Sequence, residues 1–408
     1  MEAYCERLAD PLIAELFAEL PALSIVGPRA TGKTTTAARH ARTVIRLDRP
    51  AEAVAVAADP DTSLLSWPEP ILLDEWQEVP EVLGAVKRLC DADPRPGRFI
   101  LTGSVRADIE VKTWPGTGRV TRIAMYPLTV GEQLGTSPTP FVDRIAHNTP
   151  IAARSQLNLR DYIEMSLRGG FPHAALNLGL RARKRWLETY NTEIVTRDAE
   201  LVGVGHDGTR LGRYFEAYAL NSGGTVEDAT LYRAAAIDRR TALNYQDLLN
   251  RLYIIDEIPA WTSNRLKRLS LAAKRYLVDS SLLASITGAT DNTVMSDGNL
   301  LGRLLETFVV AQFRAQAAIS EHRCRLHHLR QHNGRHEVDL IAELDSQKII
   351  GIEVKASAAP SVDDARHLAW LRDHTGDRFI AGVVLHTGPS SFQLGERLWA
   401  HPISALWT

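Results

Sequence analysis

A glycine-rich loop between a short apolar strand and a helix start is the feature that most constrains this chain. The strand is predicted at residues 22–26, and the segment after it, GPRATGKT, has the spacing G-x-x-x-x-G-K-[ST]. In such a loop, backbone N–H groups and a helix N-terminus face a polyphosphate. Lys33 would reach the β- and γ-phosphates, and Thr34 would bind Mg²⁺. The predicted loop residues are Gly27, Pro28, Arg29, Ala30, Thr31, Gly32, Lys33, Thr34 and Thr35. The alternative is a glycine turn that merely precedes a helix.

Two further apolar strands end in polar residues. The run PILLDEWQEVP, residues 70–80, begins with an apolar strand that ends in Asp74 and Glu75. Next to the loop, Asp74 would serve the Mg²⁺ site, and Glu75 would polarise the attacking water. The run RFILTGSV ends in Thr102 and Ser104, which suit either a γ-phosphate sensor or a simple turn. With the helical run PEVLGAVKRLCDAD between the last two strands, the pattern predicts a doubly wound α/β domain whose ligand lies at the carboxyl ends of its strands.

Composition sets limits on the rest of the chain. Its 408 residues exceed the ~250–300 at which single cores stop growing, so two or three domains are expected. With 47 Lys and Arg against 49 Asp and Glu, the formal net charge is −2, so a contact with nucleic acid or a membrane must be made by a local patch of charge. Cys5, Cys90 and Cys324 form no disulfide or zinc pattern, which favours a cytoplasmic protein. The acidic N-terminus is unlike a signal peptide, and no apolar run reaches the ~18 residues of a membrane span.

The middle of the chain is helical in pattern and contains a candidate DNA-binding motif. Within residues 225–261, two helical patterns separated by AIDRR precede the strand-like run LYIIDEIPAW, which is the outline of a winged helix-turn-helix. Arg pairs with guanine and Asn or Gln with adenine, so the front of the second helix could read bases. The residues there are Arg239, Arg240, Thr241, Asn244, Tyr245 and Gln246. The candidates for phosphate contacts are Lys267, Arg268, Lys274 and Arg275. The alternative is a lid or an oligomer contact.

A carboxylate-bearing hairpin is predicted near the C-terminus. The β-rich runs HEVDLIAE and KIIGIEVKAS flank LDSQ, and a turn centred on Ser346 places Asp339 opposite Glu353. Like charges directly opposed on one face are unfavourable unless a cation bridges them. Lys355 would emerge on the same face and could stabilise a hydroxide or a charge on phosphate. The alternative is a surface hairpin with a cross-strand charge cluster. The nearby histidines are predicted to form a polar surface rather than a zinc site; they are His322, His327, His328, His332 and His336.

These motifs, in this order, resemble a known family. The phosphate loop, LLDEWQEVP, LTGSV, GRVTRIAMYPLTVGE and GGFP are similar to prokaryotic AAA-type P-loop ATPases whose C-terminal half is a domain of unknown function (DUF 4143). The resemblance implies that Gly170 and Pro172 of GGFP pack on adenine, although a loop ending the preceding helix is equally expected. It leaves Arg119, Arg122 and Arg197 as candidates for a γ-phosphate sensor.

The hairpin adds a second resemblance. Asp339, followed by Glu353 and Lys355 on the next strand, with Glu306 on the preceding helix, resembles the PD-(D/E)XK nuclease core, which uses Mg²⁺ to activate water against a phosphodiester. Val338 stands where that core has proline. The resemblance implies metal ligands at Glu306, Asp339 and Glu353 and a catalytic role for Lys355. An inactive nuclease-like module kept for binding is the alternative.

Together these observations predict three parts. They are a P-loop ATPase domain at residues 1–150, a helical lid with a winged helix at 151–295, and an α/β nuclease-like domain at 296–408. The expected function is ATP and Mg²⁺ binding with ATP hydrolysis, in which the nucleotide state controls a DNA-associated winged helix and a Mg²⁺-dependent module. The alternative is a regulator that binds DNA, a protein partner or another copy of itself without cutting anything.

Overall fold

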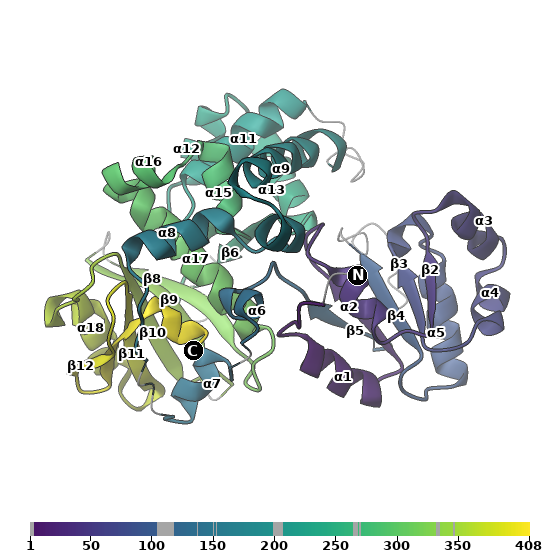
Figure 1. The fold of residues 1–408 in the computed structure, drawn as a ribbon, viewed down its shortest axis with the longest axis horizontal. Coiled ribbons are helices and arrows are strands. Elements are labelled where there is room, and N and C mark those ends of the chain that lie inside the picture. Colours follow the sequence, from purple (N-terminus) through teal and green to yellow (C-terminus); the bar gives the residue numbers. More distant parts are fainter. Residues whose placement is uncertain are drawn as a thin grey trace. The chain divides into compact units, whose positions relative to one another are not determined.

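The chain forms two compact units in a computed structural model (Figure 1). The first comprises residues 1–127 and 248–254, and the second comprises residues 128–247 and 255–408. The structure describes residues 4–103, 118–136, 138–149, 151, 153–198, 207–263, 268, 271–331, 335–345 and 347–408, without the side chains of 197 and 198.

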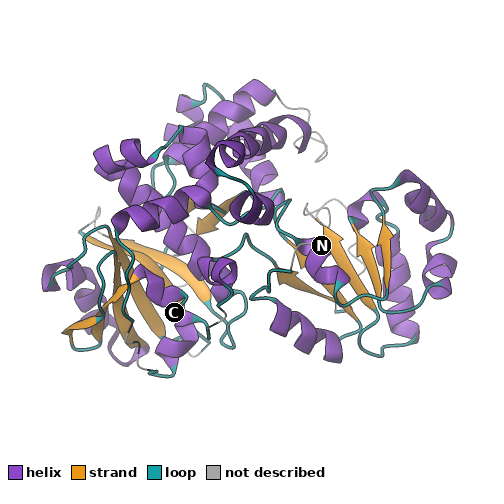
Figure 2. Ribbon diagram, viewed as in Figure 1, coloured by secondary structure: helices purple, strands orange, loops and turns teal. Residues whose placement is uncertain are grey.

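A five-stranded parallel sheet forms the first unit, which confirms the predicted α/β class (Figure 2). Its order is β2-β3-β4-β1-β5, so consecutive strands are joined by crossovers. The strands are β1 (Ala22–Val26), β2 (Thr43–Arg46), β3 (Ile71–Asp74), β4 (Phe99–Gly103) and β5 (Val120–Ala124). The helices are α1 (Asp10–Glu19), α2 (Lys33–Ala38), α3 (Pro50–Ala58), α4 (Pro60–Ser66) and α5 (Val82–Ala92), with the 3-10 turn η1 (Trp76–Glu78). Because β1, β3 and β4 are parallel neighbours, their polar carboxyl ends meet at one edge of the sheet.

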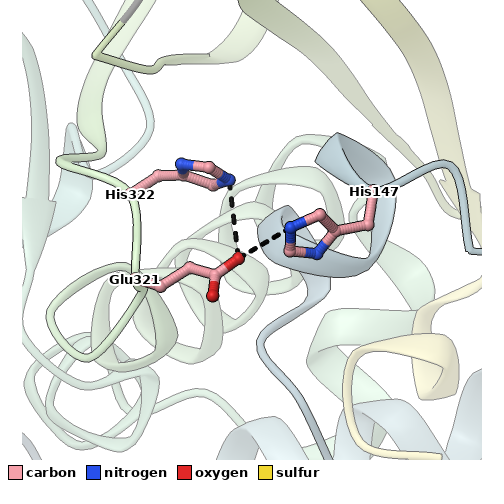
Figure 3. A group of neighbouring side chains, drawn as sticks. All are labelled: His147, Glu321 and His322. Carbon is pink, nitrogen blue, oxygen red and sulfur yellow. Dashed lines mark ion pairs between the residues drawn. The ribbon is translucent and has the colours of Figure 1, made fainter.

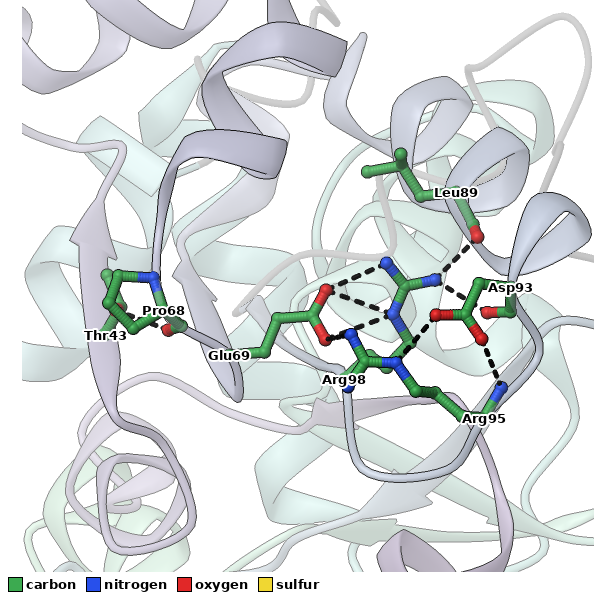
Figure 4. A network of polar contacts seen from close by, with 7 residues as sticks. All are labelled: Thr43, Pro68, Glu69, Leu89, Asp93, Arg95 and Arg98. Carbon is green, nitrogen blue, oxygen red and sulfur yellow. Dashed lines mark hydrogen bonds and ion pairs between the residues drawn. The ribbon is translucent and has the colours of Figure 1, made fainter.

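At the end of the sheet where β3 and β4 begin, a buried arginine holds α5 in place. The Arg98 guanidinium donates to the carbonyl oxygens of Leu89 and Asp93, each at 2.6 Å, at the end of α5 (Figure 4). It also forms an ion pair with Glu69 at 2.8 Å, and Arg95 joins the same carboxylate at 2.7 Å. Cations near a helix C-terminus satisfy its last carbonyls and its dipole. This network therefore fixes the end of α5 beside the amino ends of β3 and β4.

The second unit combines a helical region with a mixed sheet. Its helices before the sheet are α6 (Val130–Leu134), α7 (Phe141–Ala146), α8 (Leu159–Arg168), η3 (His173–Asn177), α9 (Leu180–Glu193), η4 (Ile194–Asp198), α11 (Gly208–Leu220), α12 (Asp228–Ala234), α13 (Arg239–Arg251), α15 (Ser280–Thr287), α16 (Asp291–Ser296) and α17 (Gly298–Ala317). The last residues of α13, 248–251, belong to the first unit. The short antiparallel pair β6 (Ile255–Ile258) and β7 (Lys274–Leu277) follows α13. The helices α12 and α13 and then the strand β6 thus occur in the predicted order, and the winged-helix assignment stays a prediction.

The mixed sheet has six strands in the order β12-β13-β11-β10-β9-β8. Its strands are β8 (Arg325–Gln331), β9 (His336–Glu343), β10 (Ile349–Lys355), β11 (Phe379–His386), β12 (Phe392–Gly395) and β13 (Leu398–Pro402), with α18 (Arg366–Thr375) between β10 and β11. Strands β8, β9 and β10 are antiparallel neighbours, whereas β10, β11 and β13 run parallel. The segment from β9 to β10 is therefore the hairpin that the sequence predicts.

Both faces of the mixed sheet are covered. Ile350 and Ile352 pack with residues of α17 in one core, while Ile349 packs with residues of α18 in another. A Cβ at Gly351 would lie 2.7 Å from the Leu368 side chain, so the glycine lets α18 approach the sheet closely. Strands buried on both faces need near-continuous apolar runs, which explains the sequence of β10 and β11.

None of the helices in the described part of the chain combines the length and the apolarity needed to cross a membrane. All three cysteines carry free thiols.

Candidate functional site

The glycine-rich loop after β1 is closed around a buried lysine. Gly27 and Gly32 have φ of 151° and 89°, and a Cβ at Gly27 would lie 2.1 Å from the Met125 carbonyl oxygen, so glycine is required there. Nζ of Lys33 donates to the carbonyl oxygen of Pro28 at 2.7 Å, and the Thr31 hydroxyl donates to the same oxygen at 2.9 Å. The lysine is thereby held inside the loop, where a phosphate group would replace the carbonyl as its partner.

Burial lowers the pKa of Lys33 to about 8, and Arg29 adds to this effect, while Glu75 and Asp74 oppose it. A buried cation without a full counter-charge is costly. Bound phosphates would place negative charge beside the Lys33 ammonium group, so the loop favours an anion.

The N-terminal segment braces this loop, a feature that the sequence reasoning missed. Arg7 is buried, and its guanidinium donates to the carbonyl oxygens of Thr31 at 2.6 Å and of Tyr126 at 2.7 Å. The Tyr4 hydroxyl donates to Asp10 at 2.8 Å. Arg7 therefore ties the phosphate loop to the segment after β5. No motif marks this arginine, because its partners are backbone oxygens far away in the sequence.

Asp74, at the carboxyl end of β3, binds two hydroxyl groups. Its Oδ1 atom accepts from Thr34 at 2.6 Å and from Thr102 at 2.5 Å. The structure thus brings together the two residues predicted for Mg²⁺, Thr34 and Asp74. Hydroxyl and carboxylate oxygens are the ligands that Mg²⁺ prefers, so these residues fit the ion. Thr102 makes the contact to Asp74 that its place at the end of β4 allows, while the other predicted sensor, Ser104, lies outside the described residues.

Glu75 is set apart from Asp74 by its backbone. It has φ of 54° in the left-handed region, directly before η1, and its carboxylate accepts a hydrogen bond from Gln77. A non-glycine residue at positive φ is uncommon and persists where the surroundings impose it. Gly103 allows this turn to pack closely, since a Cβ there would lie 3.0 Å from the Trp76 indole nitrogen. The turn thus gives Glu75 a backbone conformation that differs from that of Asp74 at the end of the strand.

The candidate sensor arginines are not all near the loop. Arg119 precedes the first residue of β5 and pairs with Asp91 of α5, at the amino end of the parallel strands. This is the edge of the sheet opposite the phosphate loop, so Arg119 cannot reach a nucleotide bound to its own loop. Arg122 lies within β5 and is exposed, and the side chain of Arg197 lies outside the described part of the chain.

The predicted GGFP contact with adenine stays a prediction, because Gly170 and Pro172 belong to the second unit. Gly170 already has structural partners there: its N–H donates to Asp279 at 2.8 Å, and its carbonyl oxygen accepts from the N–H of Leu128 at 2.6 Å. The Phe171 ring packs 4.7 Å from that of Tyr190. A Cβ at Gly170 would lie 2.1 Å from the Leu128 carbonyl oxygen, which accounts for the glycine without a nucleotide.

The hairpin has the predicted register. Ile352 pairs with Leu340, and Ile349 with Glu343, so each pair is equidistant from position 346, although Ser346 itself lies outside the described residues. Asp339 and Glu353 occupy the next positions along the two strands. The Asp339 carboxylate accepts the backbone N–H of Val354 at 3.0 Å. The two acidic residues are therefore neighbours, as the sequence indicates.

Strand β7 adds a lysine to the carboxylate cluster, which consists of Glu306, Asp339 and Glu353. Nζ of Lys274, on β7, lies 2.5 Å from Glu306 and 3.0 Å from Asp339, with only 2% of its side chain exposed. The Tyr276 hydroxyl also donates to Glu306, at 2.5 Å. Glu353 instead pairs with Lys355 at 3.1 Å. Lys274 therefore supplies, from within the chain, the positive charge that the sequence reasoning assigns to a metal ion.

The pKa shifts of the cluster follow from this burial and pairing. Burial raises the pKa of Glu306 to about 7 against the opposing pull of Lys274. Burial and the charge of Asp339 raise the pKa of Glu353 well above its usual range. Lys274 and the Val354 N–H hold the pKa of Asp339 below its usual range despite burial. Of the three carboxylates, Asp339 is thus the one whose charged form the cluster favours.

The cluster does not fit a divalent ion as it stands. Glu306, Asp339 and Glu353 do not bring three ligand atoms within 4.8 Å of one another. The oxygens of Glu306 and Asp339 that face each other are occupied by one ammonium group. We therefore derive no hydrolytic step through a metal at this cluster.

The helix predicted to read DNA presents only part of its predicted face. Arg239, Arg240 and Asn244 are exposed, in keeping with a contact surface. Tyr245 is 3% exposed, and Gln246 donates to Glu257 at 2.5 Å, so both face the protein interior. Asp238 caps the helix, because its carboxylate accepts the N–H of Thr241 at 3.0 Å. Arg239, Arg240 and Asn244 remain the candidate base-reading residues.

Three of the four basic residues predicted to contact phosphates instead form ion pairs within the protein. Arg268 is 9% exposed and pairs with Glu343 at 2.5 Å, and Arg275 is 3% exposed and pairs with Asp228. Lys274 lies in the carboxylate cluster, and Lys267 lies outside the described residues. Arg268, Lys274 and Arg275 are therefore interior ion-pair partners, and the prediction of phosphate contacts for them is wrong.

The parallel sheet, the glycine-rich loop after β1 and the acidic end of β3 define a P-loop ATPase domain. Comparison with known proteins agrees: residues 19–134 match the family model of an AAA domain, and residues 301–406 match a domain of unknown function (DUF4143). Residues 159–293 match a further domain of unknown function (DUF8612). The chain thus carries an AAA domain followed by a C-terminal DUF4143 domain, which confirms the family resemblance. The boundaries predicted near residues 150 and 295 stay a prediction.

Uncharacterized proteins of Mycobacterium bovis and Mycobacterium tuberculosis are each 26% identical to this chain over 394 residues, which is 95% of this chain and 81% of theirs. Among solved structures, a Walker-type ATPase of Pyrococcus abyssi is similar at 15% identity and a TM-score of 0.42, over 68% of this chain and 94% of that one.

Proposed function

We propose that this protein binds ATP with Mg²⁺ and hydrolyses it at the loop of residues 27–35. In this proposal Lys33 neutralises the β- and γ-phosphates, Thr34 and Asp74 serve the metal ion, and Glu75 orients the attacking water. Thr34 and Asp74 would hold the metal ion, whose positive charge would offset the negative charge of the phosphates. The AAA-domain match supports this assignment at the level of the ATPase class.

One observation carries the proposal. The hydroxyl of Thr34 and the carboxylate of Asp74 are 2.6 Å apart, beside a lysine that is buried inside the glycine-rich loop. In a glycine turn that only precedes a helix, we expect no buried cation. We also expect no hydrogen bond from a hydroxyl at the start of the helix to an acid on another strand. The combination suits a phosphate and a metal ion.

The Glu75→Gln variant should keep ATP binding and lose hydrolysis. Gln retains the size of the side chain but cannot act as a base, and a positioned base typically contributes about 10²–10⁴-fold to a rate. We therefore expect kcat to fall by at least about 100-fold, with the ATP dissociation constant little changed. Steady-state phosphate release and equilibrium titration with ATP would measure the two quantities.

Glu78→Gln is the matched control, because Glu78 is exposed in the same turn. It should hydrolyse ATP at the wild-type rate. If Glu75→Gln also turns over at that rate, the base lies at another residue, although the binding proposal would stand.

A second candidate function is a nucleotide-dependent regulator that does not cut DNA. It is favoured by Lys274, which satisfies Glu306 and Asp339 without a metal ion. In this proposal the DUF4143 region serves as a binding module, and the exposed start of α13 supplies a contact to DNA through Arg239, Arg240 and Asn244. A protein partner, or a second copy of the chain, is the remaining candidate for this surface.

If α13 contacts DNA, changing Arg239 and Arg240 together to Ala should weaken binding and flatten its salt dependence. Each phosphate neutralised by a cation contributes about 0.9 to the slope of log K against log salt. The double variant should therefore lose up to about two units of slope, as measured by fluorescence anisotropy with duplex DNA over a salt series.

A second double variant, Arg181→Ala with Lys184→Ala, removes two exposed cations from α9 and should leave the slope unchanged. Equal slopes for the wild type and the α13 variant would assign this helix to a lid or an oligomer contact instead.

A further inference from the structure

Two histidines and a glutamate from distant parts of the chain meet at the surface of the second unit. His147 follows the last residue of α7, whereas Glu321 and His322 follow α17 (Figure 3). Their ligand atoms all lie within 4.8 Å of one another, and no other such group of three occurs among the described residues. The side chains converge on one point, with Glu321 between the two imidazole rings.

The distances match those of a coordination sphere. Nε2 of His147 lies 2.8 Å from Oε1 of Glu321, and Nε2 of His322 lies 3.6 Å from the same oxygen. A tetrahedral zinc ion with ligands at about 2.0–2.1 Å holds those ligands about 3.3 Å apart. Two of the three separations lie on either side of this value and the third is no more than 4.8 Å, so a movement of the side chains would bring the three groups to three corners of a tetrahedron.

Hydrogen bonds to one buried residue fix the two segments together. Asp143 of α7 is 2% exposed, and its carboxylate accepts the N–H of Glu321 at 3.3 Å and the hydroxyl of Ser320. The backbone carbonyl of Asp143 accepts the N–H of His147 at 2.9 Å. The same aspartate therefore positions the backbone that carries His147 and the backbone that carries Glu321. Such prior ordering lowers the entropic cost of binding.

His322 adds an independent indication. Its Nε2 atom is shielded from solvent and has no hydrogen-bond partner in the described part of the chain, although it faces the Glu321 carboxylate. Buried polar atoms normally have a partner, so an orphaned imidazole nitrogen calls for an explanation. A metal ion would satisfy it.

We propose that His147, Glu321 and His322 form a binding site for a divalent transition-metal ion, with zinc as the ion that fits best. Imidazole nitrogens suit zinc and its neighbours, whereas Mg²⁺ and Ca²⁺ prefer oxygen ligands. The side chains of His147 and Glu321 are 54% and 56% exposed, which leaves a fourth position open to water. The site lies outside the phosphate loop and goes beyond the proposed ATPase activity. The histidines were expected from local spacing to form a polar surface, because the third ligand lies far upstream in the sequence.

Isothermal titration of the full chain with ZnCl₂, using protein purified without a histidine tag, tests the site. The wild type should bind one more equivalent of zinc than His147→Ala or His322→Ala. Glu321→Gln should lose at least about 10-fold in affinity, because even groups that only orient ligands cost about 10–100-fold when removed. Each variant removes a partly exposed side chain, and melting curves without zinc would establish that it is folded.

Two controls make the outcome decisive. His374→Ala removes an exposed histidine from a different surface and should titrate as the wild type does. Lys33→Ala should also bind zinc normally, which separates this site from the nucleotide site. A Co²⁺ spectrum with tetrahedral absorption bands, lost in His147→Ala, would support the geometry. Superimposable zinc isotherms for the wild type and His147→Ala would overturn the proposal and leave an ordinary His–Glu ion pair.

Discussion

Lys33→Ala should bind ATP at least about 100-fold more weakly than the wild type. The lysine is buried inside the phosphate loop, with its Nζ held 2.7 Å from the Pro28 carbonyl oxygen. Hydrogen bonds to charged groups contribute about 1.5–3 kcal/mol each, so loss of contacts to two phosphates accounts for this factor. Equilibrium titration with a fluorescent ATP analogue, in the presence of Mg²⁺, would measure it.

Lys87→Ala is the matched control, since Lys87 is a partly exposed lysine of α5 that pairs only with Asp91 among the described contacts. It should bind ATP as the wild type does. Thr34→Ala separates the metal from the phosphates, because it should reduce binding only when Mg²⁺ is present. Unchanged ATP affinity in a folded Lys33→Ala protein would remove the central claim of the proposed function.

The arrangement of the candidate nucleotide site could be predicted from sequence because each part is local. A glycine spacing defines the loop, and the rule that parallel strands present their carboxyl ends at one edge places Asp74 beside Thr34. The hairpin register could be predicted for a similar reason, since a short turn fixes which residues face each other, and Asp339 does neighbour Glu353. In both cases short-range geometry determines the contact.

The contacts that sequence reasoning missed are non-local. Lys274 reaches Asp339 from another strand pair, and Arg7 reaches Thr31 and Tyr126 across the first unit. In a sequence, a basic residue beside other basic residues is typical of an exposed surface. Here Arg268 and Arg275 are buried, because each has an acidic partner that only the tertiary fold brings near. Charge patterns alone do not distinguish these two situations.

Lys274→Met should strongly destabilise the second unit when divalent ions are absent. Removing one partner of a buried ion pair typically costs about 3–5 kcal/mol, because the remaining charge is left without compensation. Here Glu306 and Asp339 would both lose the ammonium group that lies within 3.0 Å of them. Urea unfolding, followed by far-UV circular dichroism, would measure the change.

Lys355→Met is the comparison, because that lysine is 34% exposed and pairs only with Glu353 among the described contacts, so its loss should matter much less.

The same substitution decides whether Lys274 stands in place of a metal ion. With the ammonium group removed, Mg²⁺ or Mn²⁺ has access to Glu306 and Asp339, so either ion should raise the unfolding midpoint of Lys274→Met more than that of the wild type. If Lys274→Met fails to fold, Mn²⁺ titration of the wild type and Asp339→Asn gives the answer, and the two should bind equally. Tighter Mn²⁺ binding by the wild type than by Asp339→Asn would mean that the ion displaces Lys274, and the Mg²⁺-dependent nuclease hypothesis would then replace the non-cleaving regulator.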